Sequence, residues 1–188
     1  MRIKRIDLDQ RVQMPHRVRA VEVIRRHIQP GGLSLKSGEN MMQMKYDMCG
    51  GAAVMCAMQA VALEKPEVGV VAIVPATDNM SGSKAVHPGD IIRHYNGVTS
   101  EVINTDAEGR LILADALAWG IENFKPTCVI DTATLTGAVI IGLGHHYTGL
   151  VSRDADVADH PLIRCLGKGL YGAAGAEYCF ELLLACDV

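Results

Sequence analysis

Two patterns of apolar residues run along the chain: short continuous β-branched runs, and longer segments rich in small residues. Continuous runs bounded by Pro or turn residues are typical of strands buried on both faces, and these lie at 68–74 and 128–132. The longer segments predict helices that pack closely on a sheet, at 50–65, 111–124 and 135–143. A short helix is also predicted at 15–28, followed by a loop after Pro30.

The dipeptide Asn96-Gly97 separates two further short runs, at 91–95 and 98–103, and is a strong hairpin signal. Strands that alternate with helices favour an α/β fold, and a hairpin in the same sheet makes that sheet mixed. We therefore predict a three-layer α/β sandwich in which a mixed, mostly parallel sheet lies between helices.

Composition narrows the class of protein. Of 188 residues, 49% are apolar and 21% are charged, as in folded globular proteins. The formal charge of −3 argues against a nucleic-acid partner. Six cysteines form no C-x-x-C pair and are interpreted as reduced core thiols. No apolar run of about 18 residues is evident, so we expect no membrane association and a cytoplasmic location.

The candidate chemistry centres on the heptapeptide 104–110, NTDAEGR, between a predicted strand and a predicted helix. Carboxylates at i and i+2 of an extended segment point the same way, so Asp106 and Glu108 can converge, with Arg110 beside them. Two oxygen donors next to a cation suit a divalent metal with an adjacent anion. Solvated loop charges are the alternative explanation for this spacing taken alone.

A second candidate cluster is formed by Lys36 and Asp47, on either side of a stretch with several methionines. Methionines at such spacing are more often core filler than a substrate pocket. The Gly-rich segment before Lys36 lacks the Gly that a phosphate-binding loop needs before its Lys, so that interpretation is excluded.

In order and spacing, these segments resemble the leucyl aminopeptidase (M17) family. The heptapeptide is followed by LILADAL, and further family-like segments are GGLSLK at 31–36, MKYDMCG at 44–50, PGD at 88–90 and ATLTGA at 133–138. The resemblance runs from about Gly31 to about Arg153. We therefore predict a non-matching segment at 1–30, a partial metallo-aminopeptidase catalytic domain at 31–166 and a non-matching tail at 167–188.

The resemblance implies a hydrolase that releases N-terminal residues from peptides by attack of a metal-bound water. It implies two divalent ions, Mn or Zn, a bicarbonate, peptides with a free N-terminus as partners, and homo-hexamers. The implied roles are metal ligand for Asp47, Asp106 and Glu108, electrophile for Lys36, bicarbonate holder for Arg110, and substrate contact for Met44, Asn104, Thr134 and Gly137. The three ligand carboxylates should converge within about 4–6 Å.

The segment before Gly31 departs from the family pattern. Where the family has G-K-G-x-x-F-D-x-G-G, an ungapped alignment places Ile24 at the ligand Lys and Gln29 at the metal-bridging Asp. A neutral Gln cannot bridge two cations as a carboxylate does. We therefore expect one weakly bound ion or none, with activity impaired or lost by truncation or frame disruption. The alternative is a non-catalytic chain that only assembles with other subunits.

Overall fold

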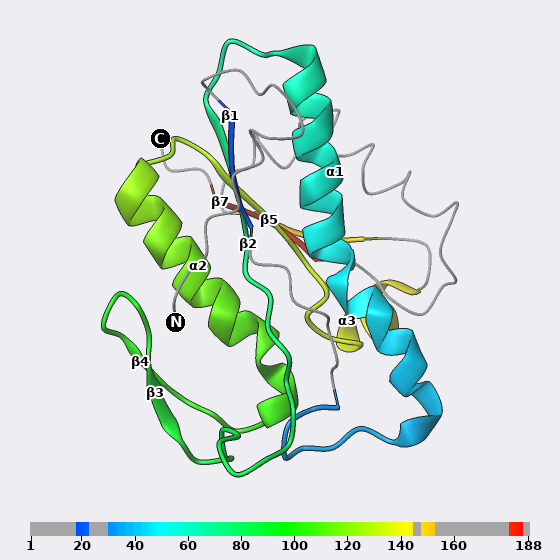
Figure 1. The fold of residues 1–188 in the computed structure, drawn as a ribbon. Coiled ribbons are helices and arrows are strands. Elements are labelled where there is room, and N and C mark those ends of the chain that lie inside the picture. The colour runs from blue at the N-terminus through cyan, green and yellow to red at the C-terminus, as the bar shows by residue number, and fades with distance from the viewer. Residues whose placement is uncertain (1–17, 23–29, 145–147, 153–180, 186–188) are drawn as a thin grey trace. The chain divides into compact units, whose positions relative to one another are not determined.

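The computed structural model describes residues 18–22, 30–144, 148–152 and 181–185 (Figure 1). These residues belong to two compact units. The first unit contains residues up to Lys45 together with Gly51–Phe124, and the second contains Tyr46–Gly50 together with the chain from Lys125 onward. Each unit is described by itself below.

The helices and strands follow one another in a fixed order along the chain. They are β1 (Val18–Glu22), the 3-10 helix η2 (Gly38–Met48), α1 (Cys49–Glu64), β2 (Val70–Val74), β3 (Ile91–Arg93), β4 (Thr99–Glu101), the 3-10 turn η3 (Thr105–Ala107), α2 (Gly109–Phe124), β5 (Val129–Ala133), α3 (Ala138–Leu143), β6 (Gly149–Ser152) and β7 (Glu181–Ala185).

In the first unit, strand β2 has a helix on each face, because successive side chains of a strand point to opposite sides. Ala72 packs with Met58 of α1, and Val54 and Val61 lie against the same cluster. Helix α2 approaches the other face so closely that a Cβ at Gly120 would lie 2.6 Å from Ile73. Figure 1 shows α1 and α2 on either side of β2. The continuous apolar run of β2 therefore reflects burial on both faces.

Strand β1 corrects one prediction from the sequence. Residues 18–22 were expected to lie within a short helix, but they pair in parallel with β2, from Val18 opposite Val70 to Glu22 opposite Val74. The local sequence carries no Pro or Gly to exclude a helix, so the decisive factor is pairing with a strand some fifty positions away. The rest of the predicted helix at 15–28 lies outside the described residues.

The predicted hairpin is confirmed, with β3 and β4 antiparallel and Ile92 opposite Ser100. A buried histidine, His94, links this hairpin to α2. Its Nδ1 lies 2.9 Å from Oδ1 of Asp115, and its Nε2 lies 2.9 Å from the Ser100 hydroxyl. An ionised carboxylate only accepts hydrogen bonds, so Nδ1 donates to Asp115, and Nε2 is hydrogen-bonded to the Ser100 hydroxyl.

The second unit contains a three-stranded sheet in the order β5-β7-β6, with β5 antiparallel and β6 parallel to β7. Gly50 lies against this unit's strand β5. The Thr132 hydroxyl donates to the Gly50 carbonyl at 3.0 Å, and a Cβ at Gly50 would overlap the Thr132 backbone. A glycine is therefore required at this close approach.

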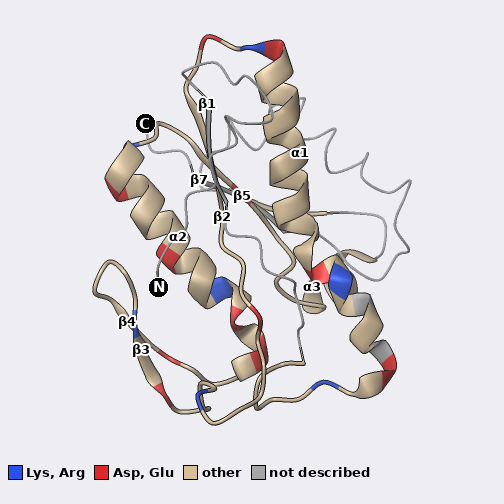
Figure 2. Ribbon diagram, in the orientation of Figure 1, with Lys and Arg blue, Asp and Glu red and all other residues tan. Residues whose placement is uncertain are grey.

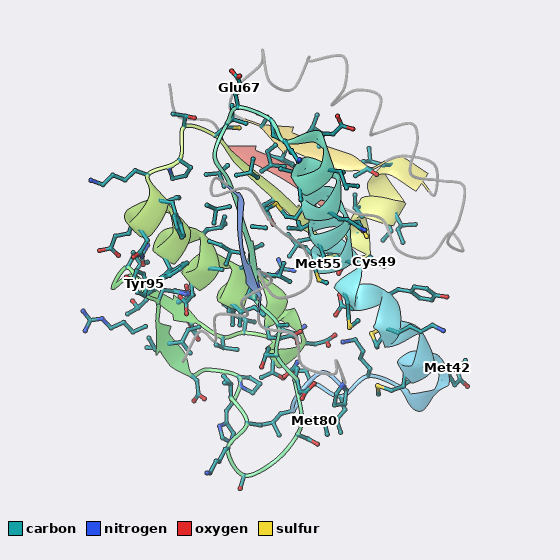
Figure 3. The ribbon with its side chains drawn as sticks, turned by 45° about the horizontal axis from the view of Figure 1, so that its top comes forward. Met42, Cys49, Met55, Glu67, Met80 and Tyr95 are labelled. Carbon is teal, nitrogen blue, oxygen red and sulfur yellow. The ribbon has the colours of Figure 1, made fainter. Side chains whose placement is uncertain are left out.

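The predicted mixed α/β character is confirmed, and the helices predicted at 50–65, 111–124 and 135–143 correspond to α1, α2 and α3. The strands that the structure describes form three small sheets, β1-β2, β3-β4 and β5-β7-β6. The loop predicted after Pro30 is wrong from Gly38 onward, where η2 begins. Its methionines are not all core filler, because Met42 is 80% exposed (Figure 3).

Two expectations from composition also change. Within the described residues, the segment Met44–Glu64 is long and apolar enough to cross a membrane by length and composition, and 17% of its most apolar 18-residue stretch is buried. An apolar core helix gives the same pattern, and α1 packs on β2 through Met58. Among the cysteines, Cys56 and Cys128 are exposed, so the core interpretation is wrong for them, and Cys49 is half-buried.

We predict that His94→Ala lowers the free energy of unfolding by about 1–3 kcal/mol, because Asp115 and Ser100 both lose a buried partner. Urea unfolding followed by circular dichroism measures this change. His87→Ala is the matched control, since that ring is 62% exposed and lies 3.5 Å from Asp90. Such surface pairs contribute at most about 1 kcal/mol. Equal destabilisation by the two variants would contradict the linking role of His94.

Candidate active site

The heptapeptide 104–110 forms the short turn that leads into α2. Asn104 has an extended backbone and caps this turn, and its Oδ1 accepts a hydrogen bond from the Asp106 amide at 2.9 Å. Glu108 follows directly, and α2 begins at Gly109. Figure 2 shows acidic positions in this turn and a basic position in the first turn of α2. The carboxylates are thus carried by regular, capped backbone.

Thr105 is buried, with 4% of its surface exposed, and joins this turn to the segment 31–36. Its hydroxyl donates to the Gly31 carbonyl at 2.9 Å and accepts from the Ser34 amide at 2.8 Å. The Thr105 amide in turn donates to the Ser34 hydroxyl at 3.3 Å. These hydrogen bonds connect residues more than seventy positions apart and fix the segment that carries Lys36.

Lys36 is brought directly to the heptapeptide, and its ammonium is hydrogen-bonded and ion-paired with Oδ1 of Asp106. The two side chains are 26% and 27% exposed, so the pair is partly shielded from water. The Lys36 amide also donates to the Pro30 carbonyl at 2.9 Å, which anchors the backbone. Two of the predicted site residues are therefore in contact.

Two glycines allow this close approach. Gly31 and Gly32 have φ values of 93° and 63°, a region that residues with a Cβ rarely adopt. A Cβ on Gly31 would lie 2.9 Å from Oδ1 of Asp106, and one on Gly32 would lie 2.8 Å from Oδ1 of Asn79. Both the backbone conformation and the available space require glycine here.

Asn79 holds the second carboxylate of the heptapeptide. Its side-chain Nδ2 donates to Oε2 of Glu108 at 2.8 Å and to the Thr105 carbonyl at 2.9 Å. The Asn79 backbone carbonyl accepts from the Gly32 amide at 3.1 Å. One half-buried asparagine therefore contacts the heptapeptide and the segment that carries Lys36.

The other predicted residues of the first unit lie on the same or neighbouring elements. Arg110 is exposed in the first turn of α2, Asn104 is the exposed cap of η3, and Met44 is half-buried in η2. Of these, Asn104 has the best-defined contact, through the cap described above. Its predicted substrate contact stays a prediction.

Asp47, Thr134 and Gly137 belong to the second unit. The Thr134 hydroxyl donates to Oδ1 of Asp47 at 2.5 Å and lies 3.1 Å from the Asp47 carbonyl. Gly137 precedes α3 as its N-terminal cap residue. Burial raises the pKa of the nearby Cys49 thiol, and the negative charge of Asp47 raises that pKa further. The carboxylate of Asp47 is thus fixed by a neighbouring hydroxyl.

The side chains gathered here are of a kind that binds divalent metal ions, but they are few. Asp106 and Glu108 offer carboxylate oxygens, which Mn²⁺ prefers. Within the part of the chain that the structure describes, no group of three His, Cys, Asp or Glu side chains is arranged to hold a metal ion. Asp47 lies in the other unit, so convergence of the three carboxylates stays a prediction. Ile24, His27 and Gln29 lie outside the described residues.

Comparison with known proteins decides the family. The profile of the cytosol aminopeptidase family, catalytic domain (M17), matches residues 29–163. This chain belongs to that family. A probable cytosol aminopeptidase of Desulforapulum autotrophicum is 67% identical over 136 residues, which cover 72% of this chain and 25% of the relative. The chain thus spans about a quarter of the length of the curated M17 relatives it matches.

Solved structures of M17 and related enzymes are similar to this chain. A leucyl aminopeptidase from Trypanosoma brucei in complex with actinonin is 32% identical, with a TM-score of 0.62 over 81% of this chain and 29% of that one. The bottromycin maturation enzyme BotP in complex with Mn is 28% identical, with a TM-score of 0.60 over 82% of this chain and 43% of that one. Both matches therefore extend over most of this chain.

Sequence reasoning found both carboxylates of the heptapeptide but missed the residues that hold them. No role was assigned to Asn79, Ser34 or Thr105. The only available signal was a polar residue beside a Gly-Gly pair or a carboxylate. Such residues are common in loops, so this signal alone could not have identified these contacts.

We predict that Thr105→Val lowers the free energy of unfolding by about 2–4 kcal/mol. The change keeps the shape of the side chain but removes both hydroxyl hydrogen bonds at a buried position, and each unmade bond costs about 1–3 kcal/mol. Chemical denaturation monitors the loss. Thr105→Ser, which keeps the hydroxyl, should retain most of the stability. Equal losses in the two variants would contradict the role of the hydroxyl.

A further prediction concerns the reactivity of Cys49. Burial and, to a smaller extent, the negative charge of Asp47 raise the pKa of this thiol, so less thiolate is present at a given pH near neutrality. Asp47→Asn should therefore speed alkylation of Cys49 by iodoacetamide, measured by peptide mass spectrometry. Asp90→Asn is the control and should leave the rate unchanged. An unchanged rate in Asp47→Asn would mean that burial alone governs the thiol.

Proposed function

We propose that this chain is part of the catalytic domain of a metal-dependent aminopeptidase that releases N-terminal amino acids from peptides. The observation that carries the proposal is the heptapeptide turn, which holds Asp106 against Lys36 and Glu108 against Asn79. Membership of the cytosol aminopeptidase family supports the same reaction class. The part that resembles the family would extend over 31–166 of a three-layer sandwich with a mixed, mostly parallel sheet, while 1–30 and 167–188 do not match the family and supply strands β1 and β7.

Asp106 and Glu108 would hold a divalent ion, Mn or Zn, and Asp47 would serve a second ion where one binds. BotP, which is similar to this chain and was solved in complex with Mn, supports a divalent ion here. Such an ion lowers the pKa of a coordinated water and stabilises negative charge on the reacting carbonyl. The residues below would position and polarise the substrate.

Lys36 would polarise the scissile carbonyl, because its ammonium lies beside Asp106 and is partly shielded from water. A charge in such a place acts more strongly than one in bulk solvent. Arg110 would hold a bicarbonate as the general base. Its place in the first turn of α2 supports this role, since the N-terminal end of a helix favours anions.

The substrate would be a peptide with a free N-terminus, contacted by Met44, Asn104, Thr134 and Gly137. A cytoplasmic location without a membrane partner is supported by the name cytosol aminopeptidase given to relatives such as the Desulforapulum protein. Packing of Met58 of α1 against Ala72 of β2 supports a place for this helix on the protein core. We also propose that the protein has no nucleic-acid partner and that it assembles into homo-hexamers.

We further propose that this chain binds its metal weakly, as one ion, with hydrolysis impaired or absent. Support comes from Gln29 and Ile24 at the places of the family's bridging Asp and ligand Lys. A bridging carboxylate offsets the repulsion between two close cations, and a neutral amide does not. A chain that binds metal without hydrolysing peptides would act only by assembling with other subunits.

The test is a Mn²⁺ titration of the wild-type chain and of Asp106→Asn combined with Glu108→Gln. Residues that merely orient a metal ligand contribute about 10-fold to 100-fold in affinity, so loss of two ligands should cost at least about 100-fold. Glu64→Gln, an exposed acidic position on α1, is the control. Hydrolysis of leucine amide is followed in parallel. Equal Mn²⁺ affinity in the double variant would contradict the proposed site.

A further inference from the structure

Asn79 is placed between the two halves of the candidate site. It lies in the loop between β2 and β3, yet its side chain contacts a carboxylate 29 positions away. The same nitrogen donates to the Thr105 carbonyl, so both amide hydrogens are used. The plane of the amide group is therefore fixed by two hydrogen bonds to the heptapeptide turn.

The hydrogen bond to Glu108 joins a neutral donor to a carboxylate. Hydrogen bonds to ionised groups are shorter and roughly twice as strong as neutral ones. Glu108 has three rotatable side-chain bonds, so without a partner its carboxylate would sample many positions. Fixing Oε2 at 2.8 Å from Nδ2 limits that freedom and sets the carboxylate beside the Thr105 carbonyl.

The surrounding backbone is built to accept the Asn79 side chain. Gly32 has a positive φ, and a Cβ there would lie 2.8 Å from the Asn79 amide oxygen. The Gly32 amide also donates to the Asn79 carbonyl. Asn79 is thus held by the segment that carries Lys36 and in turn holds the residue that would bind metal.

We propose that Asn79 is a positioning residue for the metal ligand Glu108. This inference rests on the proposed function for the metal, while the hydrogen bonds that carry it are present without one. Asn79 keeps one oxygen of Glu108 engaged and directs the carboxylate, and it adds no positive charge that would repel a cation.

Neither of two other roles for Asn79 accounts for these contacts. A purely structural asparagine in a loop needs hydrogen bonds to backbone only, but Asn79 also binds the carboxylate of Glu108. A substrate-binding asparagine would keep its amide hydrogens for the substrate, but both are used within the chain. Positioning of Glu108 explains both hydrogen bonds together.

The experiment compares Asn79→Ala with Asn123→Ala in the whole chain. Asn123 is an exposed asparagine on α2 whose Nδ2 donates to the Trp119 carbonyl at 2.8 Å, so its variant also loses an amide hydrogen bond. Mn²⁺ affinity is measured by electron paramagnetic resonance at a temperature where each variant is folded. We expect Asn79→Ala to weaken Mn²⁺ binding by about 10-fold to 100-fold and Asn123→Ala to leave it unchanged.

Hydrogen–deuterium exchange of the metal-free protein gives a second readout. Asn79→Ala should speed exchange in 104–110 because the Thr105 carbonyl and Glu108 are released. Asn79→Asp keeps the size of the side chain but cannot donate when ionised, so it should have the same effect and provides the answer where the Ala variant does not fold. Asn123→Ala should leave exchange in 104–110 unchanged.

The outcomes separate the inference from the proposed function. If the wild type binds Mn²⁺ and Asn79→Ala binds it with the same affinity, the positioning role is overturned and the proposed function stands. Unchanged exchange in Asn79→Ala and Asn79→Asp would overturn it as well. If the wild type does not bind Mn²⁺, the proposed function and the positioning of Glu108 for a metal are both contradicted. Faster exchange in Asn79→Ala would then show only that Asn79 stabilises the turn 104–110.

Discussion

One buried hydroxyl, that of Thr105, is the constraint on which the candidate site depends. It donates to the Gly31 carbonyl and accepts from the Ser34 amide, so two segments separated by more than seventy residues share one hydrogen-bonded junction. A buried backbone group left without a partner costs free energy comparable to a lost hydrogen bond. The junction therefore holds the segment leading to Lys36 against the turn that carries Asp106.

The two carboxylates of that turn have partners of different kinds. Asp106 faces the positive charge of Lys36, whereas Glu108 faces the neutral amide of Asn79. A neutral donor orients a carboxylate without offsetting its charge, and a positive one does both. The two carboxylates of the turn are thus oriented by different means, Asp106 by a charge and Glu108 by an amide.

Local sequence was sufficient for α1 and α2 and insufficient for some other elements. Helices α1 and α2 were predicted because their small and apolar residues extend over four turns, and helical hydrogen bonds join neighbours in sequence. Strand β1 was wrongly predicted as helix. The hydrogen bonds that make it a strand are formed with β2, far along the chain, and the local sequence does not reveal them. The hairpin was found because Asn96-Gly97 encodes the turn between two adjacent strands.

The sequence by itself determined the family, through the heptapeptide 104–110 and the segments around it, and it determined which carboxylates to consider. Only the tertiary structure decided that Lys36 contacts Asp106 and that Asn79 and Thr105 hold the turn. The reason is physical: a motif specifies the residues that follow one another, whereas these hydrogen bonds join residues between 26 and 74 positions apart. Which distant groups meet is set by the packing of the whole chain.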